Sequence, residues 1–63
     1  MSEHKFRIGE IVFFHPKLPS DAPHGAYQII RRLPASEGTF QYVIRSAYED
    51  HQRVAKEYEL SRN

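Results

Sequence analysis

The sequence predicts a mainly β domain, and two observations carry that prediction. The stretch from Ala26 to Ser46 holds two runs of β-branched and aromatic residues on either side of Pro-Ala-Ser-Glu-Gly, the pattern of two strands and a five-residue loop. A short run at 11–14, Ile-Val-Phe-Phe, is apolar at every position and predicts a strand with apolar residues on both faces. Because a flat sheet has one core face, the sheet must curl into a barrel or be covered on its second face.

Length and composition limit the class of protein. The 63 residues predict a single small domain over 1–63, with the polar end 1–5 disordered. The chain has no cysteine, no apolar signal-peptide core and no run of membrane-spanning length, so we expect a cytoplasmic protein with no membrane partner. Its net charge is +1, which lacks the clear basic excess of a strong nucleic-acid binder.

A proline-rich segment follows the first expected strand. From His15 to Gly25 the chain contains three prolines and one glycine, which exclude a helix and a central strand. Loops approaching this length are uncommon and are often functional. The plain alternative is a connector that wraps one side of the sheet.

The expected hairpin comes next. Pro34 should end its first strand, because proline cannot donate to a ladder, and Gly38 supplies the positive φ that the loop requires. Alternation along the strands predicts which side chains are buried. The predicted core residues are Ile11, Phe13, Ile29, Tyr42, Ile44 and Val54.

The segment from Ser46 to Leu60 allows two interpretations. As a helix it has a capping box at Ser46 and Glu49 and an apolar stripe at helical spacing over 47–58. As a strand, residues 53–56 pair beside the hairpin after a polar turn, and a short helical turn ends at Leu60.

Four pieces of the chain carry a resemblance: Phe-Arg-Ile-Gly-Glu-Ile-Val-Phe at 6–13, Tyr-Gln-Ile-Ile-Arg-Arg-Leu-Pro at 27–34, Gln-Tyr-Val-Ile-Arg-Ser at 41–46 and Arg-Val-Ala-Lys-Glu-Tyr-Glu-Leu at 53–60. The chain resembles a group of short uncharacterised alphaproteobacterial proteins, and the order of its elements resembles a small SH3-like barrel of the Tudor or KOW kind. The resemblance implies four to five antiparallel strands, a long Pro-rich loop and a strand at 53–56. The alternative fold is a three-stranded antiparallel sheet covered by a C-terminal helix.

No residue pattern points to catalysis, to a metal or to a cofactor. Four histidines are spread along the chain without zinc-ligand spacing, and a Ser-Asp-x-x-His cluster has no nucleophile elbow or oxyanion site beside it. These residues are His4, His15, His24 and His51, and Ser20, Asp21 and His24. We therefore expect a protein that is not an enzyme.

Two binding hypotheses remain. The first is a non-enzymatic module for a peptide or protein partner, which Phe14, Tyr27 and the Pro-rich loop would hold. The alternative is a nucleic-acid-binding barrel that uses an arginine and tyrosine face, since cations track phosphates and rings stack on bases. Its candidate residues are Arg31, Arg32, Tyr42 and Arg45. The alternative without a ligand is that these arginines are solvated and form ion pairs with nearby glutamates.

Overall fold

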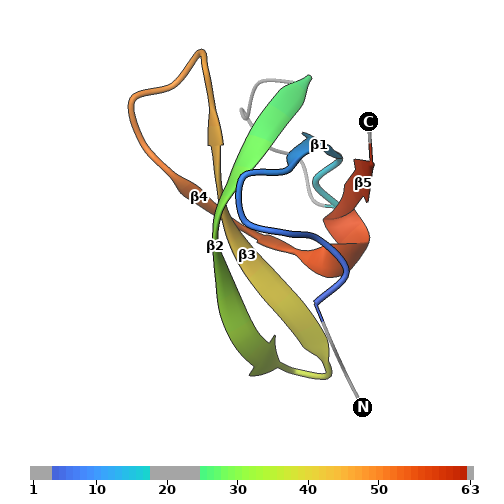
Figure 1. Ribbon diagram of the computed structural model, residues 1–63. Coiled ribbons are helices and arrows are strands. Elements are labelled where there is room, and N and C mark those ends of the chain that lie inside the picture. The colour runs from blue at the N-terminus through green and yellow to red at the C-terminus, as the bar shows by residue number, and fades with distance from the viewer. Residues whose placement is uncertain (1–3, 18–24, 63) are drawn as a thin grey trace.

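The computed structural model describes residues 4–17 and 25–62, which form one antiparallel sheet (Figure 1). The strands are β1 (Ile11–Phe14), β2 (Ala26–Ser36), β3 (Thr39–Ser46), β4 (Arg53–Lys56) and β5 (Leu60–Arg62), and a 3₁₀ turn, η1 (Glu57–Glu59), joins the last two. The mainly β class and the strand at 53–56 are thereby confirmed. The alternative with a helix over 47–58 is excluded, because this segment forms a turn and then β4.

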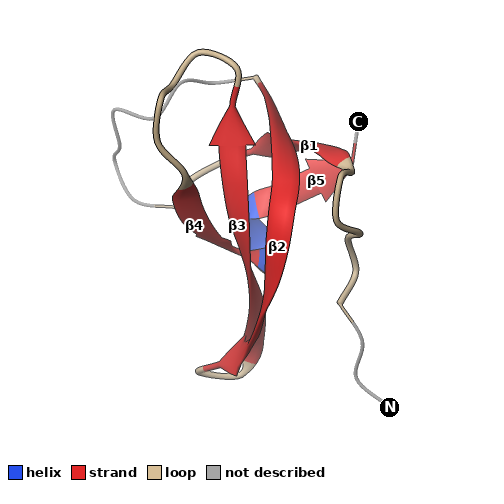
Figure 2. Cartoon of the chain, turned by 60° about the vertical axis from the view of Figure 1, so that its left-hand side comes forward, coloured by secondary structure: helices blue, strands red, loops and turns tan. Residues whose placement is uncertain are grey.

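The sheet is open and strongly twisted. Its strand order is β4-β3-β2-β1-β5, so β4 and β5 are the edges and no hydrogen-bonded ladder closes a barrel within the described residues. Figure 2 shows β1 and β5 crossing the direction of the long hairpin of β2 and β3. The predicted closure into a small barrel is therefore not observed among the described residues, and the twist lets the open sheet wrap around its own core instead.

The hairpin turn is tighter than the expected five-residue loop. Glu37 and Gly38 both have positive φ, of 53° and 81°, which is the requirement of a two-residue type I′ turn. The first strand continues through Pro34, so the prediction that Pro34 ends it was wrong. A register shift between Leu33 and Ser36 absorbs the proline, because an irregular pairing needs no N–H from it.

A second irregularity in β2 separates two consecutive arginines. The register shifts between Ile29 and Arg31, so that Arg31 lies opposite Val43 and Arg32 lies opposite Tyr42. Residues directly opposite each other share a face of the sheet. Arg32 therefore lies on the side of the core, and Arg31 lies on the outer side.

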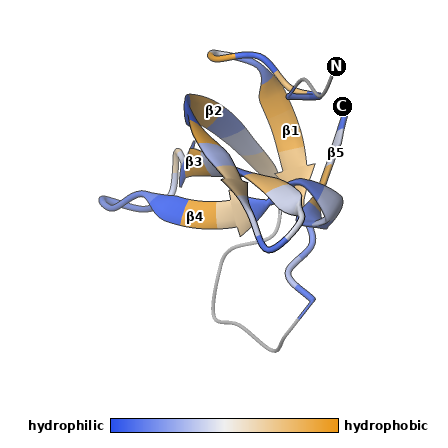
Figure 3. Cartoon of the chain, turned by 90° about the horizontal axis from the view of Figure 1, so that it is seen from below, coloured by the Kyte–Doolittle hydropathy of each residue, from blue (hydrophilic) through white to orange (hydrophobic). Residues whose placement is uncertain are grey.

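The core confirms half of the predicted set. Ile29, Tyr42 and Ile44 are fully buried, but Ile11 and Val54 are 42% and 59% exposed and Phe13 is only partly buried. In β1 and β4 the prediction chose the wrong set of alternating residues. Val12 lies opposite the buried Tyr27 and Ala55 lies opposite the buried Tyr42, so Val12 and Ala55 face the core. Figure 3 shows hydrophobic colouring along β1, which has no polar position to mark its inner side. The other buried apolar residues are Phe6, Val12, Phe14, Tyr27, Val43, Ala55 and Leu60.

The N-terminal segment is attached to the sheet from residue 4 onward. His4 Nε2 is 2.6 Å from the carbonyl oxygen of Leu33, and Phe6 is fully buried. Gly9 N–H donates to Ile29 O at 2.7 Å, and Ile29 N–H donates to Glu10 O at 2.9 Å. We expected disorder over 1–5, yet the two described residues of that stretch are both hydrogen-bonded. Residues 1–3 and most of the Pro-rich loop (18–24) lie outside the described residues.

Within 4–17 and 25–62, no helix has the length and the apolar character needed to cross a membrane.

Truncating Ile44 to alanine should lower the free energy of unfolding by about 2–5 kcal/mol, because the side chain is fully buried among core residues. The matched control is Val54→Ala on the neighbouring strand, which should change it by roughly 0.5 kcal/mol or less because Val54 is mostly exposed. Urea denaturation followed by circular dichroism measures both. Equal losses in the two variants would contradict the assignment of faces.

Candidate functional site

A basic cleft lies between the N-terminal segment, the distal half of β2 and the end of β5. It is an open cavity of about 730 Å³, and the structure brings to it residues that are far apart in the sequence. We use the name basic cleft for the cavity lined by His4, Lys5, Arg7, Arg32, Leu33, Pro34 and Arg62.

Positive charge dominates this lining. Four of its residues are Lys or Arg and none is Asp or Glu. Arg7 and Arg32 form no ion pair within the described part of the chain, whereas Arg62 Nε donates to Glu10 Oε2 at 2.9 Å. The N–H of Arg7 donates to the other oxygen of Glu10, also at 2.9 Å. This hydrogen bond and the nearby Arg62 hold the pKa of Glu10 below its usual value, so Glu10 offsets part of the positive charge.

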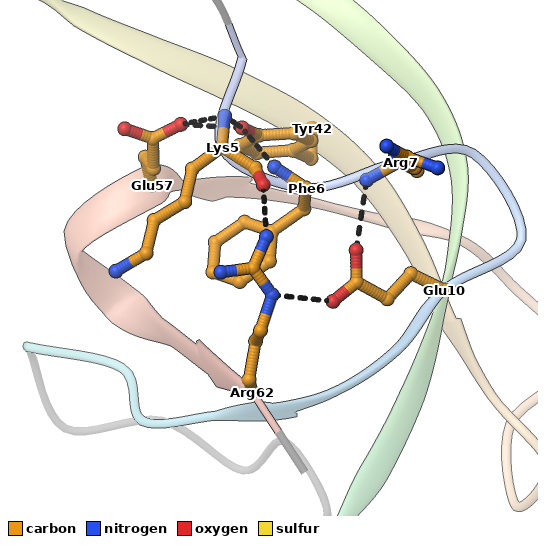
Figure 4. A network of polar contacts seen from close by, with 7 residues as sticks. All are labelled: Lys5, Phe6, Arg7, Glu10, Tyr42, Glu57 and Arg62. Carbon is orange, nitrogen blue, oxygen red and sulfur yellow. Dashed lines mark hydrogen bonds and ion pairs between the residues drawn. The ribbon is translucent and has the colours of Figure 1, made fainter.

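The hydroxyl of Tyr42 fixes one wall of the basic cleft (Figure 4). It accepts hydrogen bonds from the backbone N–H groups of Lys5 and Phe6, at 3.0 and 3.2 Å, and donates a short hydrogen bond to Glu57 Oε2. The same carboxylate oxygen accepts the N–H of Lys5 at 2.9 Å. Burial, together with the hydrogen bond to Glu57, raises the pKa of Tyr42 to about 12. The segment that carries Lys5 and Arg7 is thereby tied to the middle of β3.

Arg62 has a structural role in the same wall. Its guanidinium lies over the ring of Phe6, 5.2 Å from the centroid, and its Nη2 donates to the carbonyl oxygen of Lys5. Figure 4 shows the guanidinium between Lys5 and Glu10. These contacts engage Arg62, and Lys5 Nζ also lies over the Phe6 ring, 5.5 Å from its centroid, so the lining cations without such a contact in the described residues are Arg7 and Arg32.

The residues predicted from the sequence as binding residues divide into three groups. Phe14, Tyr27 and Tyr42 are buried, and the rings of Phe14 and Tyr27 pack edge to face at 5.3 Å, so these rings serve the core and leave no open face for stacking. Arg31 and Arg45 are exposed on the outer side of the sheet, away from the basic cleft. Arg32 is the member of the set that lines the basic cleft.

Besides Leu33 and Pro34, the sequence reasoning missed the four other ionisable lining residues: His4, Lys5, Arg7 and Arg62. The signal that could have found two of them is the Lys-Phe-Arg order at 5–7. If Phe6 is buried in an extended segment, its two neighbours must point away from the core. A frayed N-terminal end, as expected from the sequence, would give these two side chains no fixed direction.

Among residues 4–17 and 25–62, no group of three His, Asp or Glu side chains is placed to hold a metal ion. The Ser20, Asp21 and His24 cluster lies outside the described residues. What the basic cleft can do chemically is bind an anion with guanidinium and ammonium groups held on a rigid wall.

Raising the pH should destabilise the protein through Tyr42. Its pKa is raised to about 12 in the folded protein against about 10 in the unfolded chain, so its contribution is complete below pH 10 and is lost as the pH rises to about 12. The loss should reach about 2 kcal/mol by pH 12, where Tyr42 is half ionised in the folded protein, because the full two-unit shift corresponds to about 3 kcal/mol. Guanidinium denaturation of the wild type and Tyr42→Phe from pH 9 to 12 measures it, and the difference between the two isolates Tyr42 from the other groups that titrate there. An identical alkaline decline in both proteins would contradict the prediction.

Comparison of the chain with family models, curated proteins and solved structures found no match in any of the three. A function for this protein therefore has to be argued from the basic cleft itself.

Proposed function

We propose that this domain is a non-enzymatic, cytoplasmic binding module whose basic cleft binds the phosphates of single-stranded nucleic acid. The observation that carries the proposal is the convergence of Lys5, Arg7 and Arg32, from two distant segments, on one open cavity without a carboxylate in its lining. The resemblance of the element order to small SH3-like barrels is compatible with a binding role.

The chemistry of the lining favours phosphate over other ligands. Small-molecule pockets are mostly apolar with a few polar groups, and this cleft is the reverse. Arginine presents a planar fork of donors that matches phosphate oxygens, and a wall fixed by Tyr42 loses little entropy when it binds them. An open cavity admits a continuous strand, which an enclosed one would not.

The basic cleft also explains which form of binding to expect. Tyr42 has no free ring face, so the stacking that the sequence suggested is not available there. Contacts to phosphates carry no sequence information. We therefore expect binding that is largely independent of base sequence and strongly dependent on salt.

A peptide ligand is less well supported. The aromatic anchors expected for it, Phe14 and Tyr27, are both buried, and most of the Pro-rich loop lies outside the described residues. An acidic peptide could still compete for the same cations in the basic cleft. The test below therefore includes polyglutamate as a second polyanion.

Binding to a fluorescein-labelled oligothymidylate of about 12 nucleotides, followed by anisotropy over a range of salt, tests the proposal. Arg32→Ala should weaken binding and reduce the slope of log affinity against log salt by roughly 0.7–1. Arg45→Ala removes the same charge from the outer side of the sheet and should leave affinity and slope near the wild-type values.

Three results would contradict the proposal. They are the absence of binding at low salt, where screening is weakest; equal losses in Arg32→Ala and Arg45→Ala; and tighter binding of polyglutamate than of the oligonucleotide at the same charge concentration. The last result would indicate that the ligand of the basic cleft is an acidic peptide.

A further inference from the structure

The outer face of the sheet, on the side away from the core, is a second surface with a different chemistry. Register defines two rows of side chains on it. Ile11, Gln28 and Arg45 lie opposite one another across β1, β2 and β3, and Arg31, Val43 and Val54 do so across β2, β3 and β4. We use the name outer face for these two rows together with Lys56.

Two of the three aliphatic side chains in the rows of the outer face are open to solvent, whereas Val43, which lies between them on β3, is buried. Ile11 and Val54 are among the exposed large apolar residues, and they lie at its two ends on β1 and β4. Ile11, Gln28 and Arg45 also line a hollow of about 320 Å³. Strand separations of about 4.8 Å and the two-residue offset between the rows place Ile11 and Val54 about 15 Å apart.

Every charged side chain on the outer face is positive. None of the residues in β1 to β5 is Asp or Glu, so the described carboxylates all lie in the connecting segments. Arg31 and Arg45 form no ion pair within the described part of the chain. Lys56 differs from the two arginines, because Tyr58, whose ring centroid is 5.9 Å from its Nζ, and the nearby carboxylates of Glu37 and Glu59 raise its pKa.

We propose that the outer face docks an acidic amphipathic α-helix of a partner protein. Leucine-type side chains on one stripe of the helix would contact Ile11, Val54 and the hollow, and glutamates beside the stripe would pair with Arg31, Arg45 and Lys56. A helix rises 1.5 Å per residue, so positions i and i+11 of one stripe span about 16 Å and match the separation of the two exposed aliphatic residues. This proposal does not depend on the function proposed for the basic cleft.

Charge complementarity favours an acidic helix on the outer face over a second copy of the chain and over a nucleic acid. A second copy packed face to face would oppose arginine to arginine, because its own outer face has no carboxylate to offer. A nucleic acid would find cations on the outer face, but the two rows hold no exposed aromatic side chain for base stacking, and the exposed ring of Tyr58 lies only at the Lys56 end. Aliphatic residues between cations instead complement a helix with leucines between glutamates.

The test titrates ¹⁵N-labelled protein with a synthetic helical peptide of about 18 residues, with leucine on one stripe and glutamate beside it. The matched control peptide has lysine in place of every glutamate. Amide shifts should concentrate on Ile11, Arg31, Arg45 and Val54 with the acidic peptide and be absent with the basic one. Arg45→Glu, an exposed substitution that should fold, should weaken the acidic peptide about tenfold or more, whereas Arg32→Ala should not.

Each other outcome overturns the proposal. Shifts that concentrate on the basic cleft would place the acidic helix there, and equal binding of the two peptides would remove the argument from charge. No shift with either peptide would leave the outer face without this kind of partner. Concentration-dependent shifts of outer-face residues without any peptide would assign the face to a second copy of the chain.

Discussion

The hydrogen bonds of the Tyr42 hydroxyl are the interaction on which the rest of the structure depends. The ring of Tyr42 is fully buried between the N-terminal segment and the sheet, and its hydroxyl receives the N–H groups of Lys5 and Phe6 while it donates to Glu57. A buried hydroxyl without partners would cost free energy, and so would the two amides. One side chain therefore completes the core and also positions the residues that line the basic cleft.

For anion binding, the positions of the charged side chains in this protein matter more than its net charge. A net charge of +1 argued against nucleic acid, yet the carboxylates of residues 4–17 and 25–62 lie only in the connecting segments, and cations line the basic cleft and the outer face. Glu10 and Glu57 are not part of the cleft lining, but they bind residues that are: Glu10 accepts a hydrogen bond from Arg62, and Glu57 accepts one from the N–H of Lys5. A small sheet can thus present basic surfaces while the chain stays close to neutral.

The local sequence pattern predicted the strands well, but in β1 and β4 it did not predict which side chains face the core. The hairpin and the strand at 53–56 follow from β-branched residues and turn chemistry, and Ile29 and Ile44 follow from alternation. The run at 11–14 has no polar residue to mark its outer side, and the register shift at Ile30 leaves no sign in the sequence. The basic cleft could not be predicted, because the contact that forms its wall joins Phe6 to Tyr42, 36 residues away. Such contacts are set by tertiary packing and not by local propensity.

Native-state hydrogen exchange of the Lys5 and Phe6 amides tests the role of Tyr42 most directly. If Tyr42 ties the N-terminal segment to the sheet, both amides are protected in the wild type. In Tyr42→Phe the Phe6 amide should then exchange much faster, because it loses its acceptor, whereas Lys5 N–H keeps Glu57 as an acceptor. The amide of Ile44 within β3 should keep its protection. Exchange of the two amides at the rate of an unstructured peptide in the wild type would contradict the account. So would unchanged protection of the Phe6 amide in Tyr42→Phe.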